Sequence, residues 1–188
     1  MKYDKIITTM QSKDSQFVGA AGTYYVMAKL ASMRIHASVT FGNAPYVDIL
    51  ACSPTGEKQI AIQVKTAEFA RRTRGRGSDK KWAKLDWALS YKAVKTPKSN
   101  LFFAFVDLGG AWDFHQSSNI WQPTVYIIPS VRLTNEICKD WQEGWWRLQV
   151  DNNVIDSFKE DWKSIEEALT EQLINEPVAT MKEELNSL

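Results

Sequence analysis

Apolar and polar positions in the chain up to residue 130 predict one long helix and a series of short strands. Residues 14–33 carry apolar side chains at helical spacing after a capping residue at Asp14 or Ser15. The apolar positions of this helix are Phe17, Ala21, Tyr24, Ala28 and Ala31. Short β-branched and apolar runs predict the strands, which are residues 35–40, 45–52, 59–66, 101–107 and 123–128. Strands with helices before and after them predict an α/β fold, in which a mixed β-sheet is flanked by helices.

Beyond these strands the pattern is helical. Pro129 and Ser130 begin a helix that is predicted to continue to about Trp141. A capping box at residues 157–160 precedes a second helix. Its amphipathic stripe is Phe158, Trp162, Ile165, Leu169 and Leu173. Under this helix we expect three tryptophans to pack, namely Trp141, Trp145 and Trp146.

The two parts together predict a single domain over residues 1–188. Its core spans about residues 12–130, and a Trp-rich C-terminal helical extension spans about residues 131–188. Pro177 ends the last long helix. The tail at residues 181–188 is either a short final helix or a frayed end, and it is a candidate contact for a homodimer.

Two of the predicted strands form a hairpin that brings polar side chains together. The segment between them, residues 53–58, carries the turn signals Pro-Thr-Gly. If Thr55 and Gly56 form a two-residue loop, the numbers of opposed residues sum to 111. Asp48 then lies opposite Gln63 and diagonal to Lys65, because side chains two residues apart in a strand share a face.

Two interpretations of these polar residues are open. In the first, Asp48 and Lys65 are structural, as ordinary solvent-face residues or as a cross-strand ion pair. In the second, they belong to a functional site. The apolar density around them favours strands that are covered on both faces. Polar groups retained in such a place need a physical reason, which favours the functional site.

The hairpin motif resembles that of the PD-(D/E)XK nuclease superfamily, in the Gln-Xaa-Lys variant of the Mrr-like restriction enzymes. It stands here as Pro-Tyr-Val-Asp at residues 45–48 and Gln-Val-Lys at residues 63–65. Residues 19–26 resemble the small-residue first helix of that superfamily, and residues 126–130 resemble a later strand-to-helix junction. The resemblance covers about residues 15–130 and implies a restriction-endonuclease-like fold and Mg²⁺-dependent hydrolysis of DNA phosphodiester bonds.

The resemblance also implies a role for each motif residue. Asp48, the side-chain oxygen of Gln63 and the backbone carbonyl of Val64 would ligate Mg²⁺, with Mn²⁺ as a substitute, because this ion prefers octahedral oxygen ligation. Lys65 would orient or help to deprotonate the attacking water and stabilise charge on the phosphate. Thr66 is a candidate phosphate contact.

Two residues depart from the pattern of the superfamily. Gln63 stands where an acid is more common, so the site has less negative charge with which to hold a metal ion. Thr23 stands where many relatives have a glutamate in the first helix, and its hydroxyl could at best hold a metal-bound water. The alternative function is therefore a non-catalytic nucleic-acid-binding or assembly protein that retains the nuclease fold.

Charge is segregated along the chain although the formal net charge is +1. Residues 69–98 hold ten Lys or Arg against two Asp, a charge of +8, and residues 134–188 hold five against thirteen acids, a charge of −8. The basic segment begins directly after the hairpin. Residues 71–78 contain two glycines and show no helical or strand periodicity, so we expect a loop there. DNA is its expected partner, with RNA left open. The candidate nucleic-acid contacts, with Asn43 from the turn before the Asp48 strand, are Arg71, Arg72, Arg74, Arg76, Lys80, Lys81 and Trp82.

Other function classes find little support in the sequence. No apolar run approaches a transmembrane span and the first residues lack a secretory pattern, so we expect a cytoplasmic protein. Cys52 and Cys138 have no paired spacing and are interpreted as buried free thiols. His36 and His115 lie near no nucleophile motif and are interpreted as structural. A phosphate-binding Gly-Lys-Ser loop and a dinucleotide fingerprint are both absent from the sequence.

Overall fold

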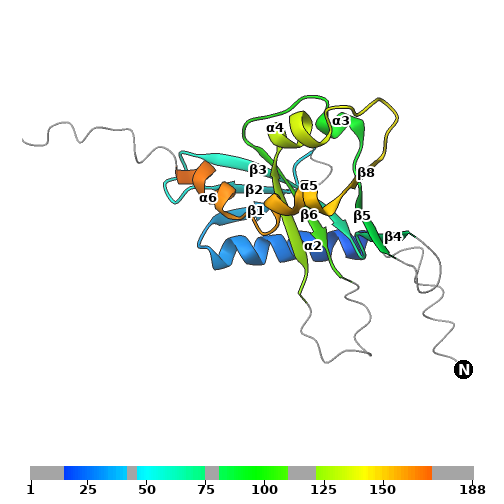
Figure 1. Ribbon diagram of the computed structural model, residues 1–188. Helices are drawn as coiled ribbons and strands as arrows, with labels where there is room; N and C mark the ends of the chain where they lie inside the picture. The colour runs from blue at the N-terminus through cyan, green and yellow to red at the C-terminus, as the bar shows by residue number, and fades with distance from the viewer. Residues whose placement is uncertain (1–14, 42–45, 75–80, 110–121, 171–188) are drawn as a thin grey trace, which may run out of the picture.

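The computed structural model describes residues 15–41, 46–74, 81–109 and 122–170 (Figure 1). Its helices and strands, in chain order, are α2 (Ser15–Ser32), β1 (His36–Val39), β2 (Ile49–Cys52), β3 (Gln59–Ala67), β4 (Arg71–Arg74), β5 (Lys81–Ala88), α3 (Tyr91–Val94), β6 (Leu101–Asp107), β7 (Thr124–Pro129), α4 (Ser130–Arg132), the π-helical turn η2 (Leu133–Ile137), β8 (Arg147–Val150), α5 (Asn152–Ile155), the 3-10 turn η3 (Asp156–Phe158) and α6 (Lys163–Thr170).

The main sheet has five strands in the order β1-β2-β3-β6-β7. Every neighbouring pair is antiparallel except β3 and β6, which are parallel. A parallel pair needs a crossover, and here the crossover contains β4, β5 and α3. The predicted α/β fold with a mixed sheet flanked by helices is therefore confirmed, and the predicted long helix and five predicted strands all form within a few residues of their expected bounds.

One face of this sheet is covered by α2 and α6, whose buried side chains join those of the strands in one apolar cluster. The buried residues of α2 are Gly22, Val26 and Leu30. Of the predicted apolar positions, Phe17 and Tyr24 are 61% and 68% exposed, and Ala28 and Ala31 are exposed as well, so the predicted packed face is wrong at these four. Gly22 explains the difference. It has no side chain, so the helix backbone can approach the sheet closely on the side of the helix that carries Gly22.

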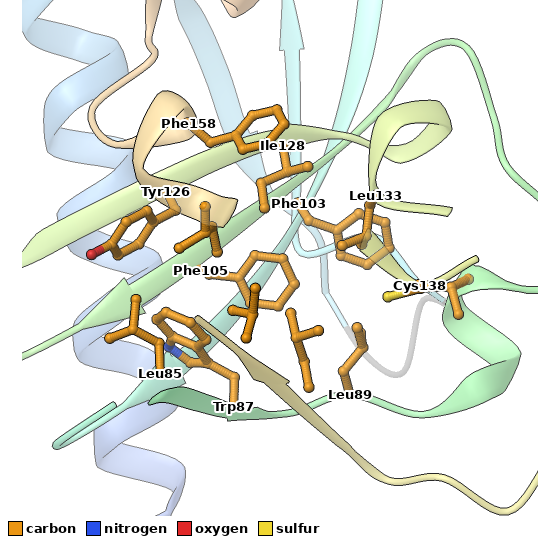
Figure 2. Close-up of a cluster of buried hydrophobic side chains, with 14 of the residues drawn as sticks. Leu85, Trp87, Leu89, Phe103, Phe105, Tyr126, Ile128, Leu133, Cys138 and Phe158 are labelled. Atoms are coloured by element: carbon orange, nitrogen blue, oxygen red, sulfur yellow. The ribbon is translucent and has the colours of Figure 1, made fainter. Parts of the chain in front are cut away.

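The other face is covered by a second, three-stranded sheet in the order β4-β5-β8, together with the helical turns near residue 135. Figure 2 shows the cluster between the two sheets, where the Trp87 ring lies against the rings of Phe105 and Tyr126. Their ring centroids are 5.3 Å and 5.7 Å away. The Trp87 indole Nε1 donates to the Val106 carbonyl oxygen at 2.9 Å, so this buried donor is satisfied while the ring fills the core.

The second sheet replaces two expectations from the sequence. The loop expected from residue 71 begins with strand β4, and the expected helical extension contains strand β8. Of the three tryptophans expected in the core, Trp141 is half-buried, whereas Trp145 and Trp146 are 48% and 67% exposed. The backbone carbonyls of Trp145 and Trp146 accept hydrogen bonds from the segment after β5, which holds their chain at the surface.

The helix predicted from residue 157 also begins later than expected. Ser157 lies in the 3-10 turn η3, and α6 begins at Lys163. At the start of α6, the side chains of Ser164 and Asp161 form a hydrogen bond. The apolar stripe is confirmed at Ile165 and Leu169, which are buried. Its last predicted member, Leu173, the break at Pro177 and the tail at 181–188 lie outside the described residues.

Both cysteines are free, as expected. Cys138 is buried, and burial raises the pKa of its thiol to about 12, whereas Cys52 is only half-buried. Among the described residues, no helix is long and apolar enough to cross a membrane.

Candidate metal and phosphodiester site

The β2–β3 hairpin has the register that the sequence predicts. The paired residues run from Ile49 opposite Ile62 to Cys52 opposite Gln59, and each pair sums to 111. The loop is longer than expected, because the Ser53 amide donates to the Lys58 carbonyl at 2.9 Å and four residues lie between them. The longer loop leaves the sum unchanged, so the predicted register is confirmed although the predicted two-residue turn is wrong.

Asp48 lies directly before β2, at the point where the two strands stop pairing regularly. Its amide donates to the Ile62 carbonyl at 3.0 Å, one residue away from the regular register. Its carboxylate oxygen Oδ2 accepts a hydrogen bond from the Val64 amide at 2.7 Å. The Asp48 side chain therefore continues the ladder that its backbone leaves, and it holds the carboxylate beside the middle of β3.

The Val64 carbonyl faces the same side of β3 as the Val64 amide, because the N–H and C=O of one residue in an extended strand point in the same lateral direction. The opposite side of β3 pairs with β6, where the Ala61 amide donates to the Asn100 carbonyl at 2.8 Å. The carboxylate of Asp48 and the carbonyl of Val64 therefore lie along the same edge of the strand, as the hypothesis of a shared metal ion requires.

Gln63 is 7% exposed, and its side-chain oxygen Oε1 is buried without a hydrogen-bond partner among the described residues. An unpartnered buried acceptor costs about 1–3 kcal/mol, so its retention needs an explanation. A bound cation would provide one, because an amide oxygen is a suitable ligand for a hard ion.

Lys65 follows Gln63 on the same face of β3 and is half-buried. Desolvation by the surrounding protein lowers the pKa of its ammonium below 10.5, and the charge of Asp48 partly opposes that shift. The ion pairs of the described residues do not include a direct contact between Lys65 and Asp48. The amine is thus close enough to feel the carboxylate without being neutralised by it, unlike in the cross-strand ion pair that the sequence leaves open.

These residues present one carboxylate, one amide oxygen and one backbone carbonyl. Such an all-oxygen donor set fits Mg²⁺ or Mn²⁺, which usually keep several waters, but it carries a single negative charge. Among the described residues there is no group of three or more His, Cys, Asp or Glu side chains that could hold a metal ion. The site therefore suits a weakly held, partly hydrated cation.

Two further candidates lie away from this group. Thr66 alternates to the helix-covered face, where it packs on Gly22, and its hydroxyl is buried without a partner among the described residues. The Thr23 hydroxyl donates to the Gly19 carbonyl within its own helix at 3.1 Å. The structure does not bring either hydroxyl together with Gln63 and Lys65.

Part of the basic segment is occupied by ion pairs within the protein. Arg71 Nε lies 3.7 Å from the Asp107 carboxylate, and Arg72 Nε lies 3.1 Å from the Asp86 carboxylate. Both arginine side chains remain about half exposed, so their outer atoms still reach solvent. Asn43, Arg76 and Lys80 lie outside the described residues, and the backbone alone is described for Arg74, Lys81 and Trp82.

The sequence did not single out Arg147, which lies in the acidic half of the chain. Arg147 Nε contacts the Asp86 carboxylate at 2.7 Å, because β8 pairs with β5. The one sequence signal is local: Asp86 stands between Leu85 and Trp87, so alternation directs it away from the core. Its partner comes from a strand 61 residues away, which no local pattern reveals.

No protein-family model and no curated protein matches the chain. A solved structure, that of the bacterial homing endonuclease I-Ssp6803I, is similar at 10% sequence identity and a TM-score of 0.49. The similarity covers 85% of this chain and 96% of the other. At that level it assigns neither a family nor an activity to this protein.

Proposed function

We propose that this protein is a Mg²⁺-dependent DNA endonuclease that hydrolyses phosphodiester bonds with the hairpin residues Asp48, Gln63, Val64 and Lys65. One observation carries the proposal. Asp48 Oδ2 accepts from the Val64 amide, the Gln63 side-chain oxygen is buried with no partner among the described residues, and desolvation lowers the pKa of Lys65. A solvated ion pair of Asp48 and Lys65 would explain neither the buried Gln63 oxygen nor the lowered pKa of Lys65.

Asp48, Gln63 Oε1 and the Val64 carbonyl would hold the ion, which when bound neutralises phosphate charge and lowers the pKa of a coordinated water. The hydrogen bond from the Val64 amide fixes the Asp48 carboxylate through Oδ2 and leaves Oδ1 outside that bond. Burial of Gln63 keeps its oxygen in place without the cost of a second buried charge.

Lys65 would act on the attacking water. Its lowered pKa increases the fraction of neutral amine near neutral pH, and a neutral amine can accept a proton from water. Once protonated, the same group stabilises the charge that develops on the phosphate, in a partly desolvated place where such an interaction is stronger than in water. The resemblance of the hairpin motif to PD-(D/E)XK nucleases supports this assignment.

The face of the main sheet that carries Asp48 remains accessible to solvent at β2. Leu50, the next residue after Asp48 on the same face of β2, is 45% exposed. Beside it lies a shallow cavity of about 260 Å³ lined by residues of β1, β2 and β3, among them His36, Ser38 and Gln59. The basic segment after β3 supports DNA as the substrate, because cationic side chains bind the phosphate backbone without reading sequence.

Cleavage of supercoiled plasmid in Mg²⁺ and in Mn²⁺ tests the proposal. We expect wild type to cut, and we expect Asp48→Ala and Lys65→Ala to cut at least about a hundredfold more slowly, as is typical when a metal ligand or a general base is lost. Asp140→Ala and Lys163→Ala are matched controls, because both side chains are exposed and lie outside the site. Cutting that survives in both site variants would refute the assignment, and the same assay on an RNA substrate tests RNA.

A second candidate is a non-catalytic nucleic-acid-binding or assembly protein that retains the fold. The observation in its favour is the single carboxylate of the donor set, with the neutral Gln63 in the second position. It predicts salt-dependent DNA retention without any metal-dependent cutting by wild type.

A further inference from the structure

Asp86 is a buried carboxylate on the outer face of the three-stranded sheet. Its neighbours Leu85 and Trp87 point into the core, so alternation along β5 places Asp86 on the opposite face. An outer face is normally open to water, yet Asp86 is 4% exposed. The cover comes from arginines of the two flanking strands, Arg72 of β4 and Arg147 of β8.

Each arginine uses the same inner atom. Arg72 Nε contacts Asp86 Oδ2 at 3.1 Å and Arg147 Nε contacts Asp86 Oδ1 at 2.7 Å. A guanidinium has five N–H donors, and contact through Nε leaves those of the terminal nitrogens for another acceptor. The arginine side chains are 54% and 49% exposed, so these donors are accessible. Two guanidinium groups are thus held side by side by one carboxylate.

Cationic side chains lie close together on this face. Arg72 lies directly opposite Lys84 in the β4–β5 register, and like charges opposed across two strands repel. Among the paired residues of β4, β5 and β8 whose side chains are described, this face carries Arg72, Lys84 and Arg147 against Asp86. Asp151, directly after β8, comes next in the same register, opposite Lys84. Gln149, opposite Asp86, is uncharged. An anion bound between the strands would relieve the repulsion.

We propose that this face is a binding surface for the phosphate backbone of a nucleic acid, in which Arg72 and Arg147 contact phosphate and Asp86 positions them. The identity of the polyanion rests on the proposed function; the geometry of the two arginines does not. Planar guanidinium groups bind phosphate oxygens through paired N–H donors, and a fixed pair loses less entropy than two free side chains. Arg147 thereby joins the nucleic-acid contacts although it belongs to the acidic half of the sequence.

A purely structural role for the two arginines makes a different prediction. If they merely neutralise Asp86, removing Arg147 leaves the buried Oδ1 of Asp86 without its partner and lowers stability, and any loss of binding follows from partial unfolding. The double variant Asp86→Asn/Arg147→Gln separates the two roles. It removes one negative and one positive charge, so the net charge stays at +1 and no buried charge is left unpaired.

Binding of a fluorescein-labelled DNA duplex, followed by anisotropy in EDTA between about 50 and 200 mM KCl, tests the inference. We expect Arg72→Gln and Arg147→Gln each to weaken binding about tenfold and to reduce the slope of log K against log salt by about 0.9, the value for one phosphate contact. The double variant should melt at the wild-type temperature and should bind the duplex as weakly as Arg147→Gln does. Arg132→Gln is the matched control, because Arg132 pairs with the exposed Glu136 and lies outside this face.

Wild-type affinity in Arg147→Gln or in the double variant, or a wild-type protein that does not bind the duplex, would overturn the inference. These outcomes are separate from the proposed function, because EDTA removes metal-dependent cleavage and the assay measures binding alone. Plasmid cutting with arginine-independent binding rejects this surface and keeps the nuclease. Arginine-dependent binding without cutting keeps this surface and rejects the nuclease.

Discussion

Gly22→Ala tests how closely α2 is packed against the strand that carries the candidate site. A Cβ at residue 22 would lie 2.8 Å from Cγ2 and 2.9 Å from Cβ of Thr66, and closer still to its hydroxyl oxygen. Thr66 is in the middle of the sheet and β-branched, so its side chain has little freedom to rotate away. Either the helix or the strand must move.

The expected cost follows from two opposing terms. Overpacking a close contact costs about 1–3 kcal/mol, whereas alanine in place of glycine favours a helix by about 0.5–1 kcal/mol. We therefore expect Gly22→Ala to lower the free energy of unfolding by about 1–2 kcal/mol. For a chain of 188 residues this corresponds to a fall of about 2–8 °C in the melting temperature, measured by circular dichroism or calorimetry.

Gly19→Ala is the control, because the new Cβ meets nothing within 4 Å and the helix preference should raise stability. The double variant Gly22→Ala/Thr66→Ala removes Thr66 Oγ1 and Cγ2 and should recover part of the loss, a coupling that a double-mutant cycle measures. If Gly22→Ala were as stable as Gly19→Ala or more stable, α2 would not be in close contact with Thr66.

Four predictions concern the site itself. Lys65→Met should abolish cutting yet raise the free energy of unfolding near pH 7 by about 1 kcal/mol, because it removes a desolvated charge; a loss of stability would contradict this. Since the folded-state pKa of Lys65 lies below 10.5, wild-type stability should rise as pH rises through that lowered pKa, and denaturation of Lys65→Met should lack this rise. Gln63→Glu should tighten Mn²⁺ binding about tenfold in calorimetry, through a second negative ligand, and unchanged affinity would exclude Gln63 as a ligand. The rate of cutting at low substrate should increase with pH up to the lowered pKa of Lys65 and then level off; a flat profile would remove Lys65 as the base.

The main sheet could be predicted because its signals are local. Apolar strands of the expected length are separated by turn residues, and the hairpin register depends on a single short loop whose centre fixes the sum of opposed numbers. For that reason the strand after Asp48 pairs with β3 as expected, and the Asp48 carboxylate reaches the Val64 amide. The irregular pairing at Asp48, which directs its carboxylate to the Val64 amide, depends on where β2 ends and has no signal in the sequence.

The second sheet could not be predicted for the opposite reason. Arg71–Arg74 has no apolar residue and resembles a solvated loop, yet it forms an edge strand, where charged side chains are common. β8 is distant in sequence from β5, and its two buried residues, Leu148 and Val150, form too short an apolar pattern to distinguish from a helix. Because this pairing was hidden, the contacts of Asp86 with the two arginines were hidden as well.

The proposed function requires that the hairpin residues share one divalent ion. A crystal soaked in Mn²⁺ and measured near the manganese absorption edge tests it most directly. We expect one anomalous peak bounded by Asp48 Oδ1, Gln63 Oε1 and the Val64 carbonyl, at distances close to the roughly 2.0–2.2 Å expected for such an ion. A saturating soak that leaves these three oxygens without a peak, or places the ion elsewhere in the molecule, would contradict it.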